Sequence, residues 1–443
     1  MCSRVEEDFT DGPVRKLKSD KVRISRLCMK CGENEGKVVI RMNDPFCWDC
    51  FLVYVVHKFR AVIGKSKLIR DAEAVLLAYS GGSSSSALLH LVHDGMEKSK
   101  FKKLRFKADV VYIDEGATFG WNWEKRQEIV FHIVDFCKSF GFTYYITSIE
   151  QVFKLIPHSK GKDLSAVPTV MKNCCQCVPQ NQDLEEKLLK LLDTCKNLTF
   201  KERLVHHLRT ELLIAVALMT GNSKVMLGTS GNRLAVQMLS DIAQGRGAHV
   251  ALNTGFSDAR NEDIMIVRPL KDFTNKEVAL YNRFNSVESV TSTSVTTMTT
   301  SRTSIERLTE KFVTGLQTEY PSTVCNITRT AEKLDSHLGH TTESRCALCK
   351  AWLDTSVDNA SALNSLRLSH VLSKGGSLVQ QNGIINGHDS DDLSDLLCYG
   401  CQAVVSQLAS ADYLPQHMKK SEKQQNLRLL QKESIQNFLI DES

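Results

Sequence analysis

Eight of the chain's 15 cysteines lie in four Cys-x-x-Cys pairs, a spacing that lets one tight turn direct two sulfur atoms at the same metal ion. The first two pairs, Cys28/Cys31 and Cys47/Cys50, are separated by 15 residues. This separation is typical of a four-cysteine zinc site, in which the protein ligands complete the tetrahedral shell. The sequence therefore predicts a structural zinc centre with Gly32 in the knuckle turn; four reduced structural thiols are the alternative.

The other two pairs are Cys346/Cys349 and Cys398/Cys401, and here 48 residues lie between the pairs. Much of the segment 350–397 is polar and rich in turn-forming residues, which is typical of an inserted loop. Because the entropy of closing a loop grows slowly with its length, such an insertion is compatible with one shared metal ion. We expect a second structural zinc centre here, with unrelated thiols as the alternative.

A glycine-serine loop follows an apolar run at 74–79 and precedes a helical pattern at 85–98. In an open α/β sheet, ligands bind beyond the carboxyl ends of the strands, and loop amides with a helix N-terminus can hold a phosphate. The loop lacks the lysine of a Walker A motif and does not match G-x-G-x-x-G. The sequence therefore predicts a nucleotide-phosphate site, with an ordinary serine-rich turn as the alternative. The candidate residues are Ser80, Gly81, Gly82, Ser83, Ser84, Ser85 and Ser86.

Short apolar runs that predict strands alternate with patterns that predict helices, which favours an α/β fold with a doubly wound parallel sheet. Thr274 and Glu277 are placed to form a capping box at the start of the last of these helices. The predicted strands are 74–79, 110–113, 144–147, 225–227 and 264–267. The predicted helices begin near Phe51 and Asn232 or span 85–98, 121–140, 200–220 and 274–284. We also expect a short strand at 37–41, a turn at Asp44-Pro45 and irregular structure over 155–190.

Changes of composition along the chain predict five segments. They are a flexible N-terminus (1–20), a zinc module with a linking helix (21–70), the α/β domain (71–285), a Ser/Thr-rich insertion (286–304), and a C-terminal zinc module with a tail (305–443).

The composition of the 443 residues is that of a globular protein, with 42% hydrophobic and 24% charged residues. No apolar run approaches the roughly 20 residues of a membrane helix, and the first residues lack the apolar core of a secretory signal. We therefore expect a cytoplasmic protein with no membrane partner. Because that compartment is reducing, the chain's cysteines indicate metal binding or thiol chemistry more than disulfide bonds.

The net charge is only +5, but positive charge is concentrated locally. Between residues 14 and 70 there are 14 Lys/Arg and 5 Asp/Glu, a balance of +9, and residues 98–107 add six more positive side chains. Clustered Lys/Arg supply the phosphate contacts of nucleic-acid binding, and Phe101 and Phe106 could stack on bases. A solvated basic face with core-facing phenylalanines is the alternative. The candidate RNA-binding residues are Lys37, Arg41, Lys58, Arg60, Lys102, Lys103 and Arg105.

The glycine-serine loop resembles the SGGxDS loop of the PP-loop ATP pyrophosphatases, whose fold is adenine nucleotide alpha hydrolase-like. Two further segments, VVYIDEG (110–116) and IVRPLKDFTNKEVALYNR (266–283), lie between the two cysteine modules. In this order they resemble the tRNA thiolation branch of that family, from about residue 25 to 440. The resemblance implies 2-thiolation of the wobble uridine (mcm5s2U formation) in tRNA-Lys, tRNA-Glu and tRNA-Gln. It also implies sulfur from a thiocarboxylated ubiquitin-related modifier.

The chain departs from the active members at the acidic positions. Ser84 replaces the aspartate of SGGxDS, and Gly228–Arg233 replaces a GHNxDD segment, so that both of its aspartates are absent. Mg²⁺ needs hard anionic oxygen ligands, so these losses argue against efficient ATP activation. The resemblance then implies the non-catalytic subunit of a heterodimer with a catalytic thiolase.

Three thiols could still have a catalytic role. Cys174 and Cys177 form a further Cys-x-x-Cys pair around Cys175, but Val178-Pro179 follows where active thiolases have glycine and arginines. Cys325 follows the last predicted helix, where the family's further catalytic cysteine would lie. Exposed loop thiols are the alternative, and an iron-sulfur cluster is not expected. Two other functions stay open: an ATP-dependent tRNA sulfurtransferase active in its own right, and a zinc-dependent RNA-binding module without a thiolation role.

Overall fold

The computed structural model describes residues 27–40, 44–97, 103–155, 168–174, 181–290, 303–334, 345–353 and 397–419. The chain forms two compact units, Met1–Tyr54 and Val55–Ser443, which are described separately. Several predictions fall outside the described residues: the N-terminal segment 1–20, Arg41, Phe101, Lys102, Cys177, and most of the segments 286–304 and 350–397.

The N-terminal unit is built around two very short strands and the start of a helix. Strands β1 (Val38–Val39) and β2 (Pro45–Phe46) pair antiparallel, and α1 (Trp48–Ser66) begins directly after them. The predicted strand near 37–41 is confirmed in β1. The turn predicted at Asp44-Pro45 is wrong for Pro45, because this residue pairs with Val39 at the edge of the two-stranded sheet, where proline is tolerated.

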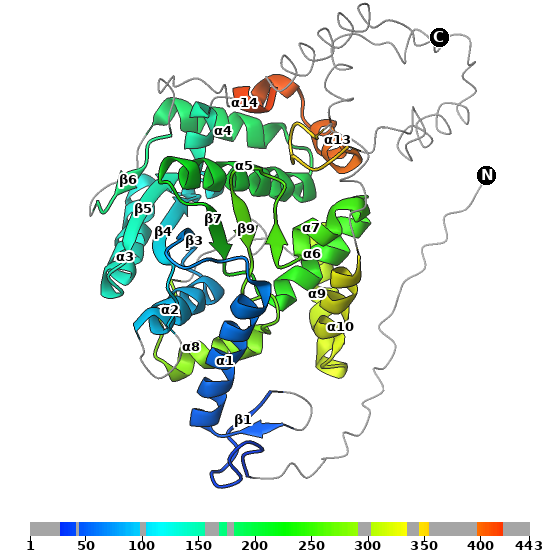
Figure 1. Cartoon of the computed structure of the whole chain (residues 1–443). Helices are drawn as coiled ribbons and strands as arrows, with labels where there is room; N and C mark the ends of the chain where they lie inside the picture. The colour runs from blue at the N-terminus through cyan, green and yellow to red at the C-terminus, as the bar shows by residue number, and fades with distance from the viewer. Residues whose placement is uncertain are drawn as a thin grey trace, which may run out of the picture. The chain divides into compact units, whose positions relative to one another are not determined.

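The second unit contains a seven-stranded sheet in the order β6-β5-β4-β3-β7-β9-β8 (Figure 1). Its five inner strands are parallel, and β6 and β8 pair antiparallel at the two edges. This confirms the predicted doubly wound sheet, whose order reverses between β3 and β7. The strands are β3 (Ala74–Ala78), β4 (Lys107–Asp114), β5 (Thr143–Ser148), β6 (Met171–Lys172), β7 (Lys224–Leu227), β8 (Ser257–Asp258) and β9 (Met265–Val267).

Both faces of the sheet are buried. Leu76 of β3 packs with Val216 and Val225 in a cluster under α5, whereas Val75 and Leu77 point to the other face. All five side chains have no exposed surface, which explains why β3 is an uninterrupted apolar run in the sequence. Helices α2 and α8 pack against each other.

The predicted helices are confirmed, and the capping box of Thr274 and Glu277 is present at the start of α8. The expectation of irregular structure over 155–190 is wrong from Gln182 onward, where Asn181 caps an amphipathic helix. The helices of the sheet-bearing unit are α2 (Ser83–Glu97), α3 (Trp123–Ser139), α4 (Gln182–Thr194), α5 (Leu198–Met219), α6 (Gly231–Ala243), α7 (Val250–Thr254), α8 (Asn275–Phe284), α9 (Ile305–Glu319), α10 (Thr323–Lys333), α13 (Tyr399–Val405) and α14 (Gln416–Lys419).

The C-terminal cysteine segment belongs to the core of the sheet-bearing unit. Cys346 and Cys401 are completely buried in one cluster with Leu188 of α4 and Leu204 and Leu208 of α5. Helix α13 contacts α5, and α9 and α10 pack on α6 (Figure 1). The segment therefore completes the apolar core instead of standing beside it.

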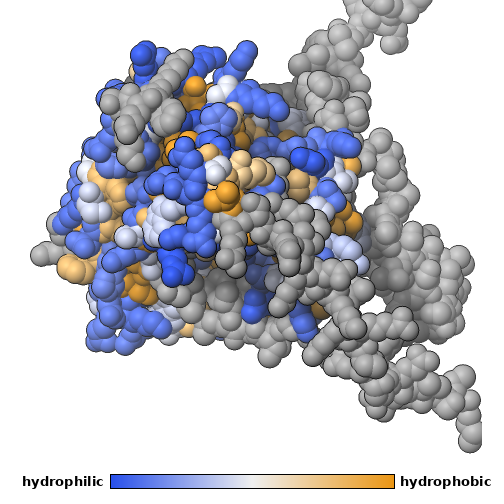
Figure 2. Space-filling model, turned by 90° about the horizontal axis from the view of Figure 1, so that it is seen from below, coloured by the Kyte–Doolittle hydropathy of each residue, from blue (hydrophilic) through white to orange (hydrophobic). Residues whose placement is uncertain are grey.

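The outer surface is mixed. On the face in Figure 2, apolar side chains lie in small groups between hydrophilic ones. None of the described helices combines the length and the hydropathy needed to cross a bilayer.

Candidate functional site

The structure brings the first two Cys-x-x-Cys pairs together. The side chains of Cys28, Cys31, Cys47 and Cys50 place their sulfur atoms within 4.8 Å of one another. Gly32 has φ +70°, and its N–H donates to the Cys28 carbonyl at 2.9 Å, which closes the predicted knuckle turn. The second pair sits at the start of α1, so that amides of a helix N-terminus lie near its sulfur atoms.

The other two pairs form a second group of the same construction. The sulfur atoms of Cys346, Cys349, Cys398 and Cys401 also lie within 4.8 Å of one another. The N–H of Lys350 donates to the Cys346 carbonyl at 2.9 Å, and Lys350 has φ +57°, the conformation that Gly32 adopts in the first group. Its second pair again sits at the start of a helix, α13.

The donor sets fit a tetrahedral metal ion. Zinc–sulfur bonds of about 2.3 Å in a tetrahedron separate neighbouring sulfur atoms by about 3.8 Å. The observed separations are 3.9 Å between Cys31 and Cys47 and 3.6 Å between Cys349 and Cys398. Burial opposes ionisation of Cys28, but hydrogen bonds from backbone N–H groups, those of Cys47 and Cys31 among them, lower its pKa to about 6 and favour the thiolate. Both groups could therefore hold a metal ion, and the identity of that ion is not fixed by the geometry.

The glycine-serine loop lies at the carboxyl end of β3, where the strand order reverses, which is the predicted position for a ligand loop. Its buried serines hold the loop itself: Ser85 Oγ donates to the Gly82 carbonyl at 2.9 Å, and Ser86 Oγ lies 3.3 Å from Tyr79 Oη. Ser80 and Ser83 are exposed. Phosphate binding by the loop stays a prediction.

Two glycines in and beside this loop lie in close contact with neighbouring residues. Gly81 has φ +77°, and a methyl group there would lie 2.9 Å from Ile133 Cδ1 and 3.3 Å from Val290 Cβ. A methyl group at Gly228, which follows β7, would lie 2.9 Å from Ser85 Cα. Gly81 and Gly228 are therefore needed for close packing within the fold.

The segment that replaces GHNxDD joins helices to one another. Asn232 Oδ1 accepts from the N–H of Asn275 at 3.0 Å, and its Nδ2 donates to Gln317 Oε1 at 2.5 Å. Arg233 forms an ion pair with Glu306 at 3.3 Å. These side chains connect α6 to α8 and α9, so both positions have structural partners where active relatives would have acidic side chains.

A buried arginine lies at the carboxyl ends of β4 and β5. The guanidinium of Arg126 donates to Asp114, Glu150 and Glu185 at 2.5, 2.7 and 3.2 Å. Burial raises the pKa of Asp114 and that of Glu150, although Arg126 opposes both shifts. Sequence reasoning missed this cluster. The acidic end of the VVYID strand was a signal, but nothing in the sequence identified its partners.

The candidate RNA-binding residues differ in their surroundings. Lys37, Lys103 and Arg105 are exposed, and Arg60 is half-buried. Lys58 Nζ lies 2.7 Å from Glu277 Oε1 in an internal ion pair. The suggestion that Phe106 could stack on a base is wrong, because its ring is 4% exposed and packs at the start of β4. The RNA contacts themselves stay a prediction.

Two of the candidate catalytic thiols are described. Cys174 is half-buried just after β6, and Cys325 is exposed on α10. Neither belongs to a group of three or more potential metal ligands among the described residues. A catalytic role for these thiols therefore stays a prediction without support from their surroundings.

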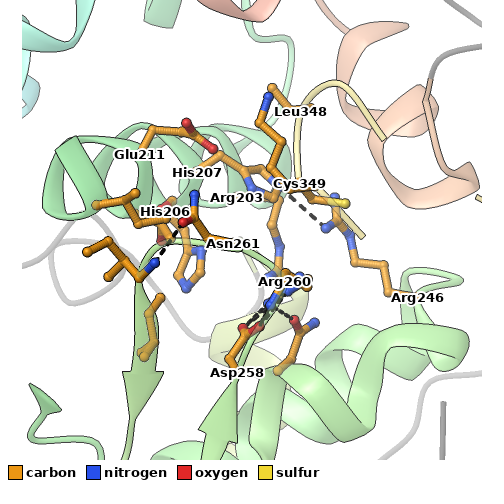
Figure 3. Close-up of a pocket in the computed structure, with 16 residues that line it drawn as sticks. Arg203, His206, His207, Glu211, Arg246, Asp258, Arg260, Asn261, Leu348 and Cys349 are labelled. Atoms are coloured by element: carbon orange, nitrogen blue, oxygen red, sulfur yellow. Dashed lines mark hydrogen bonds and ion pairs between the residues drawn. The ribbon is translucent and has the colours of Figure 1, made fainter. Parts of the chain in front are cut away.

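Beside the second cysteine group lies a pocket that the sequence did not indicate (Figure 3). Its walls come from α5, the β8–β9 edge and the turn that holds Cys349. Each of two lining arginines has an acidic partner: Arg203 pairs with Asp241, and Arg260 donates to Asp258. A third lining arginine, Arg246, forms no ion pair with a described carboxylate.

Comparison with known proteins agrees with this architecture. The solved structure of U34-tRNA thiolase NcsA from Methanococcus maripaludis, which holds a 4Fe-4S cluster, covers 74% of this chain and 93% of its own, with a TM-score of 0.51 and 16% identity. The chain therefore shares the α/β fold, with its mostly parallel sheet, of this U34-tRNA thiolase structure.

Relatives named cytoplasmic tRNA 2-thiolation protein 2 match along its whole length. The one from Xenopus tropicalis is 35% identical over 94% of this chain and 95% of its own. Those from Danio rerio and Homo sapiens are 36% and 35% identical, each over 100% of this chain and 99% of its own. The family model described by the same name matches residues 304–403, which contain α9, α10 and the second cysteine group. The chain belongs to the cytoplasmic tRNA 2-thiolation protein 2 family.

Proposed function

We propose that the protein acts in the cytoplasm as a subunit of the complex that 2-thiolates the wobble uridine of tRNA-Lys, tRNA-Glu and tRNA-Gln. It binds tRNA and serves as the non-catalytic scaffold of a heterodimer with the catalytic thiolase. The sulfur comes from a thiocarboxylated ubiquitin-related modifier. Full-length similarity to relatives named for cytoplasmic tRNA 2-thiolation supports the reaction and the compartment.

The observation that supports a non-catalytic role is that Asn232 and Arg233 bind neighbouring helices. Both side chains are engaged with neighbouring helices, through Gln317 and Glu306, and neither is acidic. A magnesium ion that carries a triphosphate requires hard anionic ligands, so this segment offers it little. We propose that ATP activation takes place on the partner.

We further propose that both cysteine groups hold zinc as structural ions. Four thiolates fill a tetrahedral shell and leave no open position for a substrate. The sulfur separations of 3.9 and 3.6 Å are those of such a shell. Metal analysis of the purified full-length protein tests this directly: two equivalents of zinc are expected, and iron with acid-labile sulfide would contradict it.

The reaction is tested in cells that lack the protein. Wobble 2-thiouridine, measured by mass spectrometry of digested tRNA, is expected to disappear and to return with the wild-type chain. Normal thiolation in the knockout would favour an RNA-binding protein without a thiolation role. ATP consumption on substrate tRNA by the purified protein alone would favour an enzyme active in its own right.

The loop is tested by a variant that spares the fold. Ser83 is exposed in the first turn of α2, where an acidic side chain is favourable for the helix. Ser83→Glu places negative charge where a phosphate would bind, and Ser83→Gln is the neutral control. Full rescue of thiolation by both variants is expected for a non-catalytic subunit. Loss of rescue with Ser83→Glu alone would show that the loop binds an anion needed for function.

A further inference from the structure

The second cysteine group contacts a buried arginine from a distant part of the chain. Arg246, which follows α6, is 4% exposed. One terminal nitrogen of its guanidinium donates to the Gly400 carbonyl at 2.9 Å and lies 3.8 Å from Cys401 Sγ, and the other lies 3.4 Å from His207 Nε2. In Figure 3 the side chain points toward Cys349 and His207.

No carboxylate of the described residues forms an ion pair with this guanidinium, and the Asp241 carboxylate, which attracts it from a distance, is already engaged by Arg203 and Asn253. The neighbouring Arg203 and Arg260 are paired with Asp241 and Asp258, whereas no described carboxylate forms an ion pair with Arg246. Its Nε also has no hydrogen-bond partner among the described residues. A buried guanidinium without a counter-charge costs several kcal/mol, so a compensating negative charge is required nearby.

The cysteine group can supply that charge. Four thiolates around a divalent ion carry a net charge of −2. The guanidinium lies against Cys401, and buried residues surround the group, so little water screens the attraction.

Glycines on both segments allow the Arg246 segment and the Cys398–Cys401 turn to approach each other closely. A methyl group at Gly400 would lie 2.4 Å from Arg246 Cγ and 2.7 Å from its Nε. A methyl group at Gly245, which has φ +73°, would lie 2.2 Å from Tyr399 Cε1. The two segments therefore pack closely against each other, and a side chain larger than glycine at position 400 would collide with Arg246.

We infer that Arg246 is the counter-ion of the C-terminal four-cysteine metal centre, and that it favours the loaded centre by compensating its charge. The inference rests on the proposed metal occupancy. The N-terminal group has no such counter-ion among its described residues: the backbone N–H of Lys30 donates to Cys28, but no hydrogen bond joins the ammonium group of Lys30 or Lys37 to a sulfur atom. The two centres should therefore differ in how strongly they depend on an outside charge.

The test uses the metal-loaded full-length protein. Arg246→Gln removes the charge and keeps donors, Arg246→Lys keeps the charge without the planar fork, and Arg233→Gln changes a half-exposed arginine of α6 as the control. Metal is counted by mass spectrometry during exposure to a chelator, and thiol labelling identifies the group that opens. Metal is expected to leave the C-terminal cysteine group about ten-fold faster in Arg246→Gln, an effect typical of residues that support metal ligands. The rate in Arg246→Lys should be intermediate. The N-terminal group and the control should be unchanged.

A purely structural role is distinguished by the unfolding temperature. The counter-ion role predicts that Arg246→Gln lowers the unfolding temperature of the metal-loaded protein but not that of the metal-stripped protein. An equal drop in both, or unchanged metal release, overturns the inference. A wild-type chain with no metal at these four cysteines would overturn the proposed occupancy as well, so the two failures are distinguishable.

Discussion

The guanidinium of Arg126 donates to Asp114 Oδ2 at 2.5 Å, and both side chains are only 2% exposed. Glu150 and Glu185 contact the same guanidinium, so one positive charge faces three carboxylates. Asp114 ends β4, and Glu150 lies two residues beyond the end of the neighbouring parallel strand β5, so both lie at the same edge of the sheet as the glycine-serine loop. At that edge, the carboxylates that contact Arg126 therefore outnumber it.

The excess of carboxylates predicts unequal effects on stability of two substitutions that each remove one charge. Arg126→Gln leaves buried carboxylates unpaired and should lower the free energy of unfolding by about 3–5 kcal/mol. Glu150→Gln keeps the acceptor Oε1, and Oε2 has no partner among the described residues, so this change should cost less than about 1 kcal/mol. Urea unfolding at neutral pH measures both. If Glu150→Gln lowered the free energy of unfolding as much as Arg126→Gln, carboxylates would not be in excess in this cluster.

The same carboxyl predicts a pH dependence. Burial holds the pKa of Glu150 above its ordinary value, so the folded protein binds its proton more tightly than the unfolded chain. This contribution to stability is present at low pH and is lost as the pH rises through the folded pKa. The free energy of unfolding of Glu150→Gln should therefore increase relative to that of the wild type as the pH rises from 4 to 7.

The two cysteine groups should respond differently to loss of one ligand. Cys346→Ser should release one metal equivalent and lower the unfolding temperature of the sheet-bearing unit, because Cys346 belongs to the core with α4 and α5. Cys28→Ser should also release one equivalent but leave that transition in place, since Cys28 belongs to the N-terminal unit. Calorimetry with metal analysis separates the two. Equal shifts of the main transition would argue against separate folding units.

Substitution of exposed basic residues should affect tRNA binding, whereas substitution of the internally paired Lys58 should affect stability. Lys103→Ala with Arg105→Ala should weaken tRNA binding and reduce the salt dependence by about one to two ion equivalents, without a change in stability. Lys58→Ala should instead lower stability by about 1–2 kcal/mol, because it leaves the buried Glu277 without its ion pair. Filter binding at several salt concentrations decides this. If Lys58→Ala alone weakened tRNA binding in a folded protein, the assignment would be reversed.

Asp258 should contribute stability only above acidic pH. Although burial opposes its ionisation, Arg260 and Arg268 hold the pKa of Asp258 below its ordinary value. A lowered folded pKa means that the stabilisation is present above the unfolded pKa of about 3.9 and is lost as the pH falls further. Asp258→Asn should cost about 3 kcal/mol at pH 7, and its difference from the wild type should shrink below pH 4. A difference that is constant with pH would contradict the ion pair.

The sequence by itself determined the parallel sheet, because buried strands are uninterrupted apolar runs and their helices carry local signals such as the Thr274–Glu277 capping box. It also identified both cysteine groups, since Cys-x-x-Cys spacing is a property of one turn and needs no distant partner. Only the tertiary structure decided what surrounds them. Arg246 meets Cys401 across 155 positions and Lys58 meets Glu277 across 219, and no local pattern encodes such contacts. Burial fixed the remaining roles: packing removed Phe106 from the surface and made Arg126 the centre of three carboxylates, because the fold as a whole sets which polar groups lose water.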